Sequence, residues 1–181
     1  MEESSNTFLK KTLLEDLLDF SGKVYKICLG FARNPWEAEE LMQEVYLKVM
    51  KNLNSLHDTE KKREWLFRIA RNTCLNHCRR ERLYKNLLFR FAGFHNDHPS
   101  PERHLMRNEQ YRIFKRSVHN LPLKMKEVFV LYTYGHLSYS EIADFLGIKE
   151  GTVRSRLNRS RRDILTSLKG EHHEKPDKKG S

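Results

Sequence analysis

Helical periodicity runs through most of this chain, and it is the feature that most limits the fold. Within residues 13–31 apolar side chains recur mostly at steps of three and four, the spacing of one helix face. They are Leu14, Leu17, Leu18, Val24, Ile27 and Cys28. Stretches with the two-residue alternation of a strand are nearly absent. The sequence therefore predicts an all-α protein.

Breaks in the periodicity divide the chain into two small helical modules. Asn34-Pro35 is a typical N-cap and first helical residue, and residues 54–62 form a polar loop before a long helix at about 63–84. The stretch AGFHNDHPSPE has the composition of a linker. We expect a flexible N-terminus at 1–12, a helical bundle at 13–90, a flexible linker at 91–106, a helix-turn-helix module at 107–169 and a solvated tail at 170–181.

The charge balance points to a polyanionic partner. Lys and Arg number 34 against 24 Asp and Glu, which gives a net charge of +10. Nucleic acid is the first candidate and an anionic membrane surface the second. No apolar run approaches the roughly 18 residues of a membrane span, and the acidic start MEESSNTF differs from a secretory signal. We expect a soluble cytoplasmic protein without membrane insertion.

The C-terminal part carries the spacing of a helix-turn-helix. Ser138 and Glu141 are placed as a capping box, and Gly147 suits the left-handed residue after a helix. Three residues separate Gly147 from Gly151, where the next helix is expected to begin. Two helices joined by so short a turn are typical of DNA-binding proteins.

The second helix of this pair has one apolar and one basic face. Val153, Leu157 and Ile164 share a face with Ser160 beside them. The opposite face carries Arg154, Ser155, Asn158, Arg159 and Arg162, which are suited to reading base edges in the major groove. A solvated basic helix without DNA is the plain alternative, but the capped helix before it favours DNA binding.

An acidic helix interrupts the basic sequence at about residues 35–53. Its inward positions are Ala38, Leu41, Met42, Val45 and Val49. Its outward positions are Glu40, Gln43, Glu44 and Leu47, with Met50 nearby. An apolar residue among carboxylates suits docking onto a basic helical partner. Alternatively, Leu47 packs against the first helix.

The long helix at about 63–84 has a cationic face with amides between the cations. Arg68, Asn72, Asn76, Arg79 and Arg80 lie on this side, opposite Leu66, Phe67, Ala70, Cys74 and Cys78. Such a stripe follows phosphates and hydrogen-bonds exposed bases. Trp65 either stacks on a base or packs against a neighbouring element, and the sequence does not decide between the two.

Three segments resemble a known family, the extracytoplasmic-function (ECF) group of bacterial RNA polymerase sigma factors. LSYSEIADFLGIKEGTVRSRLNRSRRDIL, with LPLKMKEVFVLYTYG before it, is similar to the segment that reads the −35 promoter element. EELMQEVYLKVMKNL resembles the segment that grips the coiled coil of the polymerase β′ subunit, and REWLFRIARNTCLNHCRRERL resembles the −10-recognising helix. Relative to the family pattern, Gly135 stands one residue early, before His136.

The resemblance assigns expected roles to the three surfaces. It implies that Arg154, Ser155, Asn158, Arg159 and Arg162 bind −35 DNA and that Glu40, Gln43, Glu44, Leu47 and Met50 bind polymerase. It implies that Arg68, Asn72, Asn76, Arg79 and Arg80 bind −10 DNA, with a flipped base held near Asn54, Ser55, His57 and Asp58. The implied partners are core polymerase through β′ and β, promoter DNA and an anti-sigma factor.

Signs of enzyme or metal chemistry are absent from the sequence. Cys74, Cys78 and His77 suggest zinc, but the cysteines share an apolar helix face without a second ligand pair, which favours core cysteines. With Cys28 they make an odd number without a CxxC pair. Phosphate-loop, dinucleotide and GxSxG motifs are missing. We expect a non-enzyme with no cofactor and no metal.

Two other functions remain possible on the residues alone. A stand-alone helix-turn-helix regulator explains residues 121–168 but leaves the acidic helix and the cationic stripe without a role. A polymerase-binding adaptor that reads no DNA leaves the basic faces unused.

Overall fold

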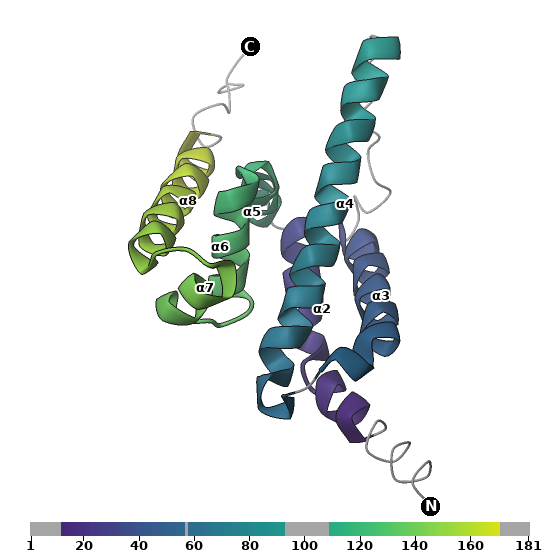
Figure 1. Ribbon diagram of the computed structural model, residues 1–181. Coiled ribbons are helices and arrows are strands. Elements are labelled where there is room, and N and C mark those ends of the chain that lie inside the picture. Colours follow the sequence, from purple (N-terminus) through teal and green to yellow (C-terminus); the bar gives the residue numbers. More distant parts are fainter. Residues whose placement is uncertain (1–11, 57, 93–108, 171–181) are drawn as a thin grey trace, which may run out of the picture.

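The computed structural model of this protein describes residues 12–56, 58–92 and 109–170, and every regular element in these ranges is helical. The N-terminal elements are α2 (Ser21–Phe31), α3 (Pro35–Asn52), the 3-10 helices η1 (Leu53–Ser55) and η2 (Thr59–Lys61), and α4 (Lys62–Ala92). The C-terminal elements are α5 (Glu109–Asn120), α6 (Leu123–Thr133), α7 (Tyr139–Leu146) and α8 (Glu150–Gly170). Figure 1 shows the two groups side by side, with α4 as a long rod. The all-α prediction is confirmed.

Helix α3 begins and packs as its sequence predicts. The Asn34 side chain accepts a hydrogen bond from the Glu37 backbone N–H at 2.7 Å, and Pro35 is the first helical residue. The buried stripe of α3 consists of Ala38, Leu41, Val45 and Val49. This stripe orients the helix, so its opposite side faces solvent.

Two helix boundaries differ from the prediction. The first helical stretch is interrupted at Asp19 and Phe20, just before Ser21-Gly22, a pair that weakens helices. The Phe20 ring instead packs edge-on against Phe67, with 6.3 Å between ring centroids. Helix α4 continues to Ala92, into residues expected to begin the linker, because no Gly or Pro follows Tyr84 until position 93. Three predicted segments lie outside the described residues: the linker beyond Ala92, the N-terminus up to residue 11 and the tail from residue 171.

The helix-turn-helix of the C-terminal module has the predicted ends. Ser138 accepts a hydrogen bond from the Glu141 N–H at 3.2 Å, and the Glu141 carboxylate accepts one from the Ser138 N–H at 2.7 Å. Gly147 follows α7 with φ 64°. Helix α8 then begins at Glu150, one residue before the expected start, and packs on α5, α6 and α7.

The two modules pack against each other in this structure. Gly30 of α2 meets α6 so closely that an added Cβ atom would lie 2.6 Å from the Val130 side chain. Arg71 of α4 pairs with Glu127 of α6, with 2.7 Å from Nε to Oε1. Short-range periodicity carries no information about such contacts, so the sequence did not predict this packing.

Candidate nucleic-acid interface

Helix α8 presents the predicted basic face to solvent. Its core side is formed by Val153, Leu157, Ser160 and Ile164, all at most 5% exposed. The five expected −35 residues are all exposed: Arg154, Ser155, Asn158, Arg159 and Arg162. Their location is as predicted, and their contacts with DNA stay a prediction.

Aromatic rings lie beneath two arginines of α8. The Arg154 guanidinium carbon lies 6.0 Å from the Tyr139 ring centroid, and that of Arg161 lies 5.2 Å from the Tyr132 centroid. The two tyrosine rings are 5.5 Å apart. Sequence reasoning missed Arg161. The one signal that could have found it is the shared seven-residue spacing of the two arginines and the two tyrosines.

The cationic stripe of α4 is also exposed. Arg68, Asn72, Asn76, Arg79 and Arg80 face solvent, while Leu66, Phe67, Ala70 and Cys74 are fully buried. Within the stripe, Arg79 donates to the Asn76 side-chain oxygen at 3.3 Å. Arg68 lies over the Phe145 ring of α7, 5.7 Å from its centroid, so the C-terminal module packs against one edge of the stripe.

The loop between α3 and α4 supports Trp65. The Trp65 indole N–H donates to the Ser55 hydroxyl at 3.3 Å, and the partly buried Trp65 side chain packs against the core. The structure shows Trp65 packing against the core, and stacking on a base stays a prediction.

The residues of this loop that are expected to hold a flipped base differ in their hydrogen bonds within the protein. Ser55 donates to the Asn52 carbonyl at 2.7 Å, and Asn54 is exposed. The Asp58 carboxylate accepts the Glu60 backbone N–H at 3.0 Å, and this hydrogen bond lowers the pKa of Asp58. Asp58 therefore serves as a cap of η2. His57 lies outside the described residues.

The outward side of α3 forms a continuous exposed line, which we call the α3 seam: Trp36, Glu40, Gln43, Leu47 and Met50. Leu47 is 57% exposed and Met50 61%, so the alternative that Leu47 packs against the first helix is wrong. The Trp36 indole N–H donates to Glu40 at 3.0 Å. The steps of four, three, four and three residues match a coiled-coil contact line.

Glu44 differs from the other expected polymerase-binding residues. Its carboxylate pairs with Lys48 at 2.7 Å and with Arg80 of α4 at 3.4 Å, and its side chain is only 35% exposed. Glu44 therefore connects α3 to α4 at the edge of the seam.

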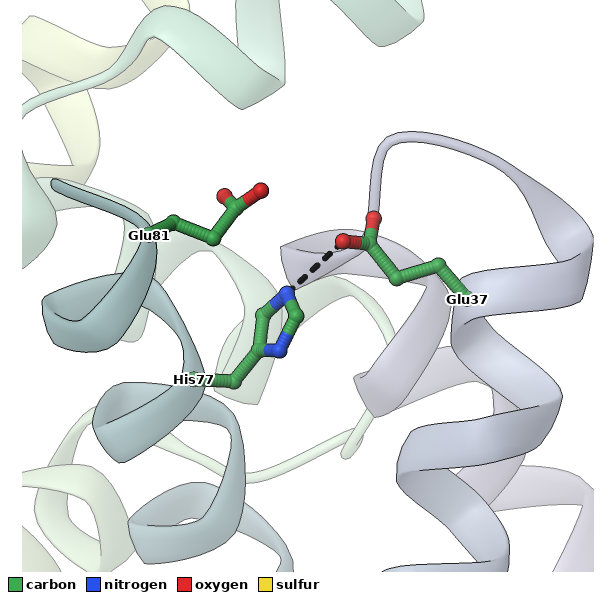
Figure 2. A group of neighbouring side chains, drawn as sticks. All are labelled: Glu37, His77 and Glu81. Carbon is green, nitrogen blue, oxygen red and sulfur yellow. Dashed lines mark hydrogen bonds and ion pairs between the residues drawn. The ribbon is translucent and has the colours of Figure 1, made fainter. Parts of the chain in front are cut away.

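A group of three charged residues holds the start of α3 against α4 (Figure 2). His77 Nε2 lies 2.7 Å from Glu37 Oε1, and Glu81 pairs with Arg33. The hydrogen bond with Glu37 raises the pKa of His77. Burial alone would raise the pKa of Glu37, but hydrogen bonds from His77 and the Arg33 N–H outweigh it and lower the pKa.

The same three residues have possible metal-ligand atoms within 4.8 Å of one another. These groups already have protein partners. Glu37 pairs with His77, and Glu81 pairs with Arg33. Cys74 lies elsewhere, in the core, where its Sγ atom is 3.9 Å from Cys28 Sγ. The structure therefore accounts for Glu37, His77 and Glu81 as an ion-pair network.

Comparisons with known proteins match both modules. The sequence pattern of Sigma-70 region 2 matches residues 18–92, and that of Sigma-70 region 4 matches residues 111–164. In the part of the chain that the structure describes, no helix is long and apolar enough to cross a membrane.

Curated relatives match along most of the chain. The ECF RNA polymerase sigma factor SigW of Bacillus subtilis is 29% identical over 85% of this chain and 88% of its own. The RNA polymerase sigma-H factor of Pseudomonas aeruginosa is 30% identical over 84% of this chain and 83% of its own. The ECF sigma-E factor of Haemophilus influenzae is 32% identical over 71% of this chain and 73% of its own.

Solved structures show the same fold. The sigma factor RpoE of Bartonella quintana, solved in complex with the anti-sigma factor NepR, superposes with a TM-score of 0.64 at 23% identity, over 88% of this chain and 98% of its own. CnrH, in complex with the cytosolic domain of CnrY, gives a TM-score of 0.59 at 19% identity, over 89% of this chain and 90% of its own. Together with the curated relatives, these matches show that the chain belongs to the extracytoplasmic-function group of RNA polymerase sigma factors, which direct promoter-specific transcription initiation.

Proposed function

We propose that this sigma factor divides its work among three surfaces: the α3 seam binds core polymerase, the α4 stripe binds the −10 element, and the α8 face binds the −35 element. The observation that carries the proposal is that all three expected surfaces face solvent on separate helices of one chain. Sigma factors are not enzymes, so RNA synthesis is the work of polymerase.

The α3 seam suits a helical, basic partner. Leu47 and Met50 provide apolar contact area, and Glu40 provides negative charge beside them. Their spacing supports packing along the β′ coiled coil, and we also expect contact with the β subunit. Because Glu44 pairs with Lys48 and Arg80, it contributes through the position of α3 rather than as a free carboxylate.

The α4 stripe suits a DNA strand that is being opened. Arg79 and Arg80 attract phosphates, while Asn72 and Asn76 offer amide groups to exposed bases. Unstacking a base costs about a few kcal/mol, which contacts in a pocket recover. We place this pocket near Asn54 and His57, with Ser55 and Asp58 holding the loop in shape.

The α8 face suits duplex DNA. A recognition helix contacts base edges mainly through its first turns, where Arg154, Ser155 and Asn158 lie. Arginine binds guanine bidentately, and each such pair contributes about 1–3 kcal/mol of discrimination. Arg159 and Arg162 extend the contact to later turns.

An anti-sigma factor completes the list of proposed partners. The two structural relatives were solved with the anti-sigma factor NepR and with the cytosolic domain of CnrY. Their likeness supports an equivalent partner for this chain, which we infer acts in the cytoplasm together with polymerase.

Binding to core polymerase tests the role of the α3 seam. The double variant Leu47→Arg, Gln43→Ala introduces a cation and removes an amide at the centre of the α3 seam. We expect its affinity for core polymerase to fall about 30-fold or more. The matched control is Leu18→Arg, because Leu18 is similarly exposed at 52% but lies outside the seam. Equal affinity of both variants, with helicity retained, would contradict the proposed docking surface.

A further inference from the structure

Four side chains of the C-terminal module form one continuous arrangement, which we call the arginine–tyrosine stack: Arg154, Tyr139, Tyr132 and Arg161. Arg154 lies 6.0 Å from the Tyr139 centroid, the two rings lie 5.5 Å apart at 53°, and Arg161 lies 5.2 Å from the Tyr132 centroid. The stack connects two positions of α8 to the end of α6 and the start of α7.

The two halves of the stack differ in exposure. Tyr132 and Tyr139 are partly buried and pack against the hydrophobic core, which fixes their rings. Arg154 and Arg161 are exposed, so their end groups reach solvent, and each guanidinium carbon lies within 6.0 Å of a ring centroid. Arg154 also donates to the Glu150 carboxylate at 3.4 Å, through one of its five N–H groups. A guanidinium over an aromatic ring is attracted to it and keeps its N–H edge available for a second partner.

The spacing of the two arginines fits a DNA groove. Seven residues correspond to about 10.5 Å along a helix and a rotation of only about 20°, so both arginines lie on the same side of α8. The major groove is about 12 Å wide. The first turns of a recognition helix contact bases. Arg161 follows Arg154 by about two turns, where contact with the sugar–phosphate backbone is expected.

We propose that Tyr132 and Tyr139 are positioning residues that hold Arg161 toward a backbone phosphate and Arg154 toward a base of the −35 element. The inference rests on the proposed role of α8 and adds Arg161 as a further DNA-contacting residue. A long arginine side chain loses rotamer freedom on binding, and a ring that already restricts it reduces that loss.

The simpler explanation is that both tyrosines only fill space in the core. Substitutions to Leu and to Phe separate the two explanations, because Leu keeps apolar volume without a ring whereas Phe keeps the ring without the hydroxyl. We would measure promoter affinity of the full chain assembled with core polymerase, at several salt concentrations and with variants of the −35 sequence.

The positioning role predicts a distinct result for each variant. Tyr132→Leu and Tyr139→Leu each weaken promoter binding about two- to fivefold, and the Phe variants restore it. Tyr139→Leu also reduces discrimination among −35 sequences. Tyr132→Leu and Arg161→Ala instead weaken all sequences equally, and Arg161→Ala lowers the slope of log affinity against log salt by about 1.

The outcomes separate this inference from the proposed function. If the wild type shows no −35 preference with core polymerase, the proposed role of α8 fails. If the wild type is selective but the Leu variants match it, or the Phe variants bind as weakly as the Leu variants, the positioning role is overturned.

Arg161→Lys tests the inference even if the tyrosine variants fail to fold. This variant changes an exposed site, and it keeps the positive charge but not the planar face of the guanidinium. We expect a two- to fivefold loss with an unchanged salt slope, and wild-type affinity would overturn the inference.

Discussion

At the scale of single residues, the clearest structural device is the ion-pair network of Glu37, His77 and Glu81. It joins the first turn of α3 to the middle of α4, and the hydrogen bond with Glu37 raises the pKa of its histidine above the ordinary value. The sequence indicated that these residues were polar, but it did not indicate that His77 and Glu37, 40 positions apart, form a pair.

The network predicts a pH-dependent contribution to stability. Because the folded-state pKa of His77 is raised above 6.5, its contribution is complete below 6.5 and is lost as pH rises through the raised value. Glu37 has a pKa lowered from 4.5, so its contribution is complete above 4.5 and is lost only as pH falls through the lowered value. Both contributions are therefore complete between pH 4.5 and pH 6.5.

Replacing His77 removes its part of the pH dependence of stability. We expect His77→Gln to lower the free energy of unfolding by roughly 1.5–3 kcal/mol below pH 6.5, with a smaller loss at higher pH. Urea unfolding between about pH 5 and about pH 8 measures the effect. A loss of the same size at every pH would show that the charge on His77 does not contribute.

At the scale of elements, helix ends were predicted better than helix lengths. The Ser138–Glu141 box and the left-handed Gly147 follow from local chemistry, and both are confirmed. At the break, the Phe20 ring packs against Phe67, which lies far along the sequence, so this contact leaves no local signal. The connection after α6 differs from the family pattern in that His136 takes the left-handed conformation, with φ 54°. The residue before it, Gly135, has no room for a side chain, because an added Cβ atom would lie 2.6 Å from the Leu131 carbonyl oxygen.

The two left-handed residues predict opposite effects on stability. His136→Gly removes the steric cost of a side chain at positive φ, and we expect a gain of about 0.5–1 kcal/mol after the added entropy of glycine in the unfolded chain. Gly147→Ala introduces that cost and should lose about 1 kcal/mol. Thermal and urea unfolding of both variants measure the difference. Destabilisation by His136→Gly would mean that the imidazole makes contacts that outweigh the strain.

At the scale of the whole molecule, the packing of the modules engages arginines next to the α4 stripe. Arg63 donates to Glu141 at 2.5 Å, and Arg71 donates to Glu127. These pairs join residues 78 and 56 positions apart, and surface charges separated so far leave no periodic signal in the sequence. The exposed faces could be predicted because each belongs to one helix, whereas the interface between modules could not.

A substitution at Gly30 tests whether this packing exists in solution. We expect Gly30→Leu to separate the modules and increase the radius of gyration, because the new side chain would overlap Val130 and Tyr134. Gly22→Leu is the matched control on the same helix, since no atom lies within 4 Å of a Cβ added there. Small-angle scattering compares the two variants. Identical profiles with both modules folded would contradict the packed arrangement.

Transcription from a promoter library tests the central claim most directly. Core polymerase with this protein should initiate on a defined class of promoters. Asn76→Ala should reduce initiation through the −10 element and Arg159→Ala through the −35 element, each by about fivefold or more. Lys26→Ala, an exposed cation on α2, should have no effect. Failure of the wild type to initiate on any promoter, or equal activity of all three variants, would contradict the account.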